Sequence, residues 1–157
     1  RKIPLFESFL SSKTISNEAE IFEGVEGIKT VREMALNNMN SKDQMLYFGN
    51  PASGHDYVLG YWDDWNKRRI SKKIFAKIIY NQDAEKYAKR RRKQNYTTVK
   101  YLPKKGDTHA WIEIYNDVMA ITIKHKQPMS IVIRNKYIID SFRVYFSIIW
   151  DCSINNI

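Results

Sequence analysis

The stretch from Thr108 to Asp151 constrains the fold most, because strand and helix patterns follow one another in a single dense apolar run. Three short apolar runs come first, and they predict strands over His109–Tyr115, Val118–Lys124 and Ser130–Arg134. Apolar residues then recur at helical spacing over Lys136–Trp150, which predicts a strongly amphipathic helix. Because no other segment is as apolar, we expect the core to form around this helix.

The residues before this stretch alternate between the two periodicities. They predict strands over Glu20–Glu23, Gln44–Gly49, Phe75–Tyr80 and Thr97–Leu102, and helices over Gly24–Met39, His55–Ile70 and Asp83–Gln94. Alternation of this kind predicts an α/β domain whose mixed or largely parallel sheet has helices on both faces. Together with the later runs, the sheet would have about seven strands.

The first residues form a separate pattern. A short helix is predicted over Arg1–Ser12, with Leu5, Phe6, Phe9 and Leu10 on one stripe, and polar residues follow up to Glu18. We therefore expect a linker or dimerisation helix in residues 1–18 and the α/β domain in residues 19–157. The stripe would dock on a partner, such as the same helix of a second copy, or fold back on the domain. Because the chain begins at Arg1 rather than Met, we expect a piece of a longer protein.

Composition narrows the class of protein. The 157 residues have the length of one domain, and 43% hydrophobic residues supply a core. The single cysteine, Cys152, excludes an internal disulfide and fits a reducing, cytoplasmic compartment. No run of ~18 apolar residues exists, so we expect no membrane span. His55 and His125 have no neighbours at metal-ligand spacing, so we expect neither a metal nor a cofactor.

The net charge of +9 has two interpretations, an anionic partner or a compositional bias spread over a solvated surface. One run concentrates the charge, namely Lys89, Arg90, Arg91, Arg92 and Lys93. Tyr87 and Tyr96 flank the run but do not interleave with it, as a stacking platform for nucleic acid requires. The run is therefore a candidate nucleic-acid site, and a solvated helix face is the favoured interpretation.

Polar and aromatic residues gather near the predicted strand ends. Ligands of α/β sheets bind at the carboxyl ends of strands. On that geometry we predict a ligand site formed by Gly49, Asn50, Trp62, Tyr80, Asn81, His109 and Trp111. The competing interpretation, which we favour for the tryptophans, is packing between a helix and the sheet.

The strand that begins at His109 resembles the phospholipase D signature, H-x-K-x4-D. That family's His acts as nucleophile or acid, its Lys binds phosphate and its Asp orients. Here Trp111 takes the place of the Lys and Asn116 that of the Asp, with Asp117 one residue late; Thr122–His125 replaces the downstream Gly-Ser-x-Asn element. Without the phosphate clamp and the orienting carboxylate, His109 cannot do this chemistry. The resemblance therefore implies the fold without the activity.

A second resemblance covers residues 20–34, 67–80, 97–103 and 127–150, which are similar to the C-terminal effector domain of TrmB-type transcriptional regulators. The family pattern Phe-x-Gly-x-x-Gly-Ile is present at Phe22–Ile28, and an Asn-Lys pair precedes the aromatic terminal helix. The resemblance implies a phospholipase D-like fold without catalytic residues and a homodimer. It also implies a small-molecule effector and DNA bound through a winged helix-turn-helix outside this chain.

From these patterns we predict the non-catalytic effector-binding and dimerisation domain of a transcriptional regulator. One alternative is an enzyme, a divergent phosphodiesterase or nuclease of the phospholipase D superfamily that uses His109 from two subunits. The other is an interaction module in which Lys89–Lys93 contacts nucleic acid directly.

Overall fold

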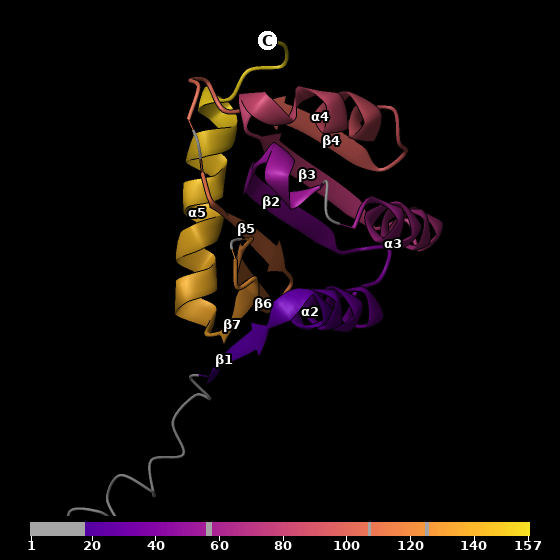
Figure 1. Ribbon diagram of the computed structural model, residues 1–157, viewed down its shortest axis with the longest axis vertical. Helices are drawn as coiled ribbons and strands as arrows, with labels where there is room; N and C mark the ends of the chain where they lie inside the picture. Colours follow the sequence, from indigo (N-terminus) through magenta and orange to yellow (C-terminus); the bar gives the residue numbers. More distant parts are fainter. Residues whose placement is uncertain (1–17, 56–57, 107, 125) are drawn as a thin grey trace, which may run out of the picture.

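A computed structural model describes residues 18–55, 58–106, 108–124 and 126–157. The predicted helix Arg1–Ser12 and His125 lie outside the described residues. The described chain forms one seven-stranded sheet with a long helix on one face and three helices on the other (Figure 1).

The strands are β1 (Glu18–Glu23), β2 (Gln44–Asn50), β3 (Phe75–Tyr80), β4 (Thr97–Tyr101), β5 (Ala110–Tyr115), β6 (Val118–Ile123) and β7 (Met129–Arg134). Their order across the sheet is β1-β7-β6-β5-β2-β3-β4. β2, β3 and β4 run parallel, and the remaining pairs are antiparallel. The predicted α/β class, the seven strands and the mixed sheet are confirmed.

The helices are α2 (Gly24–Asn38), α3 (Leu59–Ser71), α4 (Glu85–Arg92) and α5 (Lys136–Cys152). Two predicted helix starts were wrong. His55 closes a 3-10 turn, η1 (Ala52–Gly54), through its N–H to the Ala52 carbonyl (2.9 Å), so α3 begins only at Leu59. Residues Gln82–Ala84 form a second 3-10 turn, η2, before α4.

Both faces of the sheet are buried, because successive strand residues point to opposite sides. On the α5 side, Leu46, Phe48, Ile79, Ile114 and Met119 pack with Ile139 and Phe146 of the helix. On the other side, strand residues that include Met45, Tyr47, Ile78 and Tyr115 pack with Leu36 of α2, Trp65 of α3 and Ala88 of α4. The face of β5 that contains Trp111, Glu113 and Tyr115 is therefore an interior face as well.

The glycine pattern at the start of α2 has a structural role. Gly24 adopts a left-handed φ of 71°, and its N–H donates to the Pro128 carbonyl (2.7 Å). A Cβ on Gly27 would lie 2.7 Å from the backbone carbon of Phe22. The Phe-x-Gly-x-x-Gly-Ile pattern thus lets α2 turn tightly out of β1.

Candidate functional site at the strand ends

Three chain segments meet where β2 and β3 end and β5 begins. The Asn81 N–H donates to the Asn50 carbonyl (3.0 Å), and the Asn81 side-chain amide donates to the Thr108 hydroxyl (2.7 Å). Thr108 in turn donates to the Gly49 carbonyl (2.8 Å). Sequence reasoning placed Gly49, Asn50 and Asn81 here but missed Thr108, whose only signal is its position beside His109.

Gly49 shapes this edge through its backbone. Its φ is 75°, in the left-handed region, and the β2–β3 register shifts between Phe48 and Asn50. A Cβ on Gly49 would lie 3.3 Å from the Ala110 carbonyl oxygen of β5. The glycine therefore turns the Asn50 side chain inward while β5 stays close.

Several buried polar atoms at this edge have no hydrogen-bond partner within the described chain. They are both side-chain polar atoms of Asn50, the side-chain oxygen of Asn81 and both ring nitrogens of His55. Asn50 and Asn81 are 1% and 0% exposed. An unsatisfied buried polar group costs about 1–3 kcal/mol, so such groups normally bind water or a ligand. This edge is therefore the best candidate for a site.

His55 is held neutral. Its ring stacks on Tyr87, with centroids 4.5 Å apart and planes at 15°. Burial, helped by the positive charges of Arg91, Arg32 and Lys124, lowers the pKa of His55 to about 3. At neutral pH its imidazole therefore offers one donor and one acceptor and carries no charge.

The cavity beside His55 is small. Its volume is about 20 Å³, and its lining includes Arg32, Tyr47, Trp62, Tyr80 and Arg91. That space suits on the order of one or two water molecules rather than a metabolite. The predicted ligand residues Trp62 and Tyr80 therefore line an interior cavity, and Trp62 also donates to the Gly54 carbonyl (3.2 Å).

A wider hollow opens at the same edge of the sheet, beside η2. It encloses about 810 Å³, and its lining residues are Gln82, Asp83, Glu85, Lys105, Gly106 and Ile157. None of these residues was predicted as a site. Side chains of both charge signs line it, so charge alone selects no class of ligand.

Trp111 is part of the core. It is buried, its ring packs against Gly54, and its indole N–H donates to Glu113 (2.9 Å). The Tyr115 hydroxyl donates to the other oxygen of Glu113 (2.7 Å), and Arg32 of α2 forms an ion pair with the same carboxylate. Trp111, at the strand position where the phospholipase D signature has lysine, thus belongs to a buried cluster in which Arg32 balances the charge of Glu113.

The other two signature positions also differ from a catalytic arrangement. His109 is exposed just before β5, and within the described chain its side chain has no polar partner. Asn116 lies in the β5–β6 hairpin turn with a φ of 44°, a conformation that asparagine tolerates well. Asn116 therefore serves the turn.

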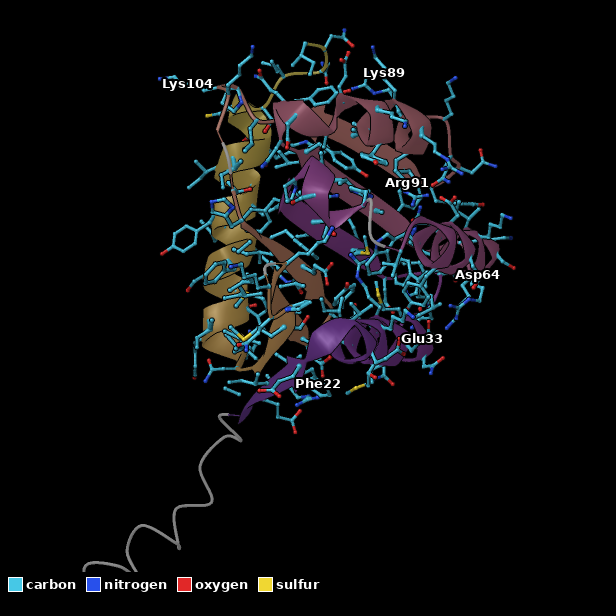
Figure 2. All side chains as sticks on the ribbon, in the orientation of Figure 1. Phe22, Glu33, Asp64, Lys89, Arg91 and Lys104 are labelled. Atoms are coloured by element: carbon cyan, nitrogen blue, oxygen red, sulfur yellow. The ribbon has the colours of Figure 1, made fainter. Side chains whose placement is uncertain are left out.

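The basic run lies on α4 and the turn after it, and most of it is occupied by structural contacts. Arg91 is 3% exposed and pairs with Asp63 of α3 (3.2 Å), which also pairs with Arg90 (2.5 Å). Lys89 pairs with Glu85 (2.5 Å), and Arg92 donates to the Asn155 carbonyl. Figure 2 shows Lys89 on the outer side of α4 and Arg91 on the side toward α3. Arg91 is therefore an interior residue, unavailable to nucleic acid.

The residues that the structure describes contain neither a metal-binding cluster nor a membrane-spanning helix. No group of three or more His, Cys, Asp or Glu side chains is placed to hold a metal ion. Among the same residues, no helix is both long and apolar enough to cross a membrane. Cys152 is exposed and free.

Neither a family model nor a curated protein matches this sequence. Solved structures do match. TrmBL2, described as an archaeal chromatin protein with a novel mode of DNA binding, has a TM-score of 0.62 at 13% identity over 96% of this chain. This chain spans 58% of the length of TrmBL2.

Two further structures match this chain over nearly the whole of their own length. NucT from Helicobacter pylori has a TM-score of 0.63 at 12% identity, covering 88% of this chain and 98% of its own. Nuc from Salmonella typhimurium, a phospholipase D family member, has a TM-score of 0.53 at 12% identity, covering 87% and 95%. The chain therefore has a phospholipase D-like fold. Its structural likeness to TrmBL2 indicates that the fold is also TrmB-like, as the sequence predicted.

Proposed function

We propose that this chain is the non-catalytic effector and dimerisation domain of a cytoplasmic, DNA-binding transcriptional regulator. Its winged helix-turn-helix would lie outside these residues. The phospholipase D-like fold and the structural likeness to TrmBL2 support this proposal. The net charge of +9 fits a protein that works close to DNA.

The replacement of the phosphate-binding lysine by Trp111 carries the non-catalytic part of the proposal. A lysine there would have to enter the space now filled by an indole against Gly54, next to the buried Arg32. Burying a second cation in that place is costly unless it is paired. The Trp111–Glu113–Arg32 cluster thus stabilises the fold at the position where an enzyme would need a side chain that binds phosphate.

The effector would bind the buried polar groups of Asn50, His55 and Asn81 that have no hydrogen-bond partner within the described chain. The cavity beside His55 holds only water-sized groups. A larger effector would therefore enter after the hydrogen bonds of Thr108 with Gly49 and Asn81 break. Binding would shift DNA affinity only if the effector favours one of two states of the dimer. A small, neutral and polar effector fits these groups best.

The enzyme alternative rests on the likeness to Nuc and on the exposed His109 at the start of β5. Two copies of His109 would have to meet across a dimer and do the chemistry without a lysine at position 111. The test is hydrolysis of a generic phosphodiester by the wild type and His109→Ala. Our proposal expects no difference between them, and turnover that the variant loses would favour the enzyme.

A further inference from the structure

One corner of the sheet is left open on the α5 face. Strand register places Phe75 and Lys77 of β3 on this face, and Lys77 lies beside Thr98 of β4. The next row pairs Ile79 with Lys100. α5 covers Ile79 and the neighbouring β2 residues, but Phe75 and Thr98 remain exposed. The corner, defined as Phe75, Lys77, Tyr96, Thr98, Lys100 and Trp150, ends at the outermost strand, β4.

Aromatic rings border the corner at both ends. Phe75 is 46% exposed and meets Tyr96 edge to face, with centroids 5.3 Å apart and planes at 87°. Tyr96, in the turn before β4, has a left-handed φ of 55°. At the opposite end, Trp150 of α5 lies next to both lysines. Exposed rings on a sheet face provide surfaces on which bases stack.

The two lysines between these rings lack acidic partners. Their ammonium groups lie 5.3 Å (Lys77) and 4.9 Å (Lys100) from the Trp150 ring centroid, and Lys100 also donates to the Trp150 carbonyl (2.9 Å). Within the described chain, neither forms an ion pair with a carboxylate, and Asp151, next to Trp150, pairs with neither. Two like charges over one ring repel each other, and a bound anion would relieve that repulsion.

This arrangement differs from the basic run on α4. There, the carboxylates of Glu85 and Asp63 pair with three of the cations, and Arg91 is buried. In the open corner, both positive charges remain available, and exposed Gln44 and Thr98 add hydrogen-bonding groups. The charges without acidic partners and the exposed Phe75 ring thus occur together on the sheet rather than on α4.

We propose that this corner binds single-stranded nucleic acid, with a phosphate between Lys77 and Lys100 and a base stacked on Phe75. Stacking requires an unpaired base, which is why a single strand rather than a duplex is the ligand. The site goes beyond the proposed regulator function, in which DNA is bound by a different domain. It lies on the α5 face, opposite the face that contains Trp111 and His55.

The test is fluorescence anisotropy of a labelled oligothymidylate of ~15 nucleotides, titrated with the protein at several salt concentrations. We expect Phe75→Ala to weaken binding about 5- to 100-fold and Phe75→Trp to retain it, since tryptophan preserves the stacking surface. Lys77→Gln combined with Lys100→Gln should weaken binding and make the salt slope shallower by roughly 0.7, the value for one phosphate contact on a single strand.

The matched control is Lys89→Gln combined with Lys93→Gln, which removes two charges from the basic run. We expect this control to bind as the wild type does, and far-UV circular dichroism should show all variants folded. The proposal is overturned if the control loses binding while Phe75→Ala keeps it, or if the wild type does not bind at low salt. It is also overturned if Phe75→Ala changes only the sedimentation of a dimer, since the corner would then join two copies. None of these three outcomes affects the hydrolysis test of the proposed function.

Discussion

The carboxylate of Glu113 on β5 is paired with the guanidinium of Arg32 on α2, and both side chains are buried. Arg32 lies over the rings of Tyr47, Trp62 and Trp65 at 4.8, 4.7 and 5.0 Å. This pair joins the helix layer to the strand on which a phospholipase D enzyme has its signature. The Arg32–Glu113 pair should therefore contribute strongly to the stability of the fold.

Removing one charge of this pair should destabilise the fold strongly. Glu113→Gln leaves the Arg32 charge buried without a counter-ion, and we expect a loss of about 3–5 kcal/mol in the free energy of unfolding, measured by urea denaturation. The control is Glu33→Gln, which breaks the half-exposed bidentate pair with Arg68 and should cost about 1 kcal/mol or less. Equal losses in the two variants would contradict the structural role of the Arg32–Glu113 pair.

The burial of His55 should make the stability of the fold depend on pH. Its folded pKa of about 3 lies below its ordinary value of 6.5, so below pH 6.5 the unfolded chain binds a proton that the folded chain does not. The stabilisation is complete above pH 6.5 and is lost as the pH falls toward 3. The expected loss from this residue is about 3 kcal/mol between pH 7 and pH 4.

His55→Phe isolates that contribution, because phenylalanine keeps the stacking on Tyr87 and cannot titrate. Urea denaturation from pH 7 to pH 4 should show a shallower fall in stability for the variant, by up to about 1.4 kcal/mol per pH unit. Parallel curves for the wild type and His55→Phe would show that His55 has the same pKa in the folded and the unfolded chain, which would contradict its lowered pKa.

Two glycines in helices should respond oppositely to alanine. Gly27→Ala places a Cβ 2.7 Å from the Phe22 backbone and should destabilise by about 1–3 kcal/mol. Gly60→Ala in α3 meets nothing within 4 Å and should stabilise by about 0.5–1 kcal/mol. Thermal denaturation of the two variants tests both signs, and a neutral Gly27→Ala would contradict the close contact of α2 with β1.

The outer face of α5 should carry the dimer contact if the proposed function holds. Its exposed apolar stripe contains Tyr137, Ile138, Val144, Tyr145 and Ile148. A Glu at Val144 or at Ile148 should shift the protein toward monomers in sedimentation velocity, because a buried unpaired charge is costly. Ser147→Glu, the same charge beside the stripe, should have a much smaller effect. A monomeric wild type would refute the dimer.

Period-two and helical spacing predicted most of the fold. β3 matches its predicted bounds, and α5 starts where its apolar stripe starts, because the Asn135 side chain caps it by accepting from the Ile138 N–H (3.1 Å). The strand order was not predictable, because it depends on which apolar faces meet across long sequence separations. The start of α3 was missed because His55 closes a 3-10 turn that fits the same spacing.

The candidate site was predictable only in part. Gly49 and Asn50 end β2 and Asn81 follows β3, and that position alone placed them at one edge. Arg32 was missed although it lies on the same helical stripe as Ile28 and Ala35, where a charged residue signals a buried partner. Its partner, Glu113, is distant in the chain, and only the fold brings the two together. Lys77 and Lys100 belong to no charge run, so their shared place beside Trp150 had no sequence signal.

The most direct test of the central claim, that this chain does no phosphodiester chemistry, is hydrolysis of bis(p-nitrophenyl) phosphate followed at high protein concentration and long times. Nuc from Salmonella typhimurium serves as the comparison with the same fold. We predict that the wild type and His109→Ala both release nitrophenol at the rate of buffer alone. Release above that rate by the wild type, abolished in a folded His109→Ala variant, would contradict the non-catalytic function.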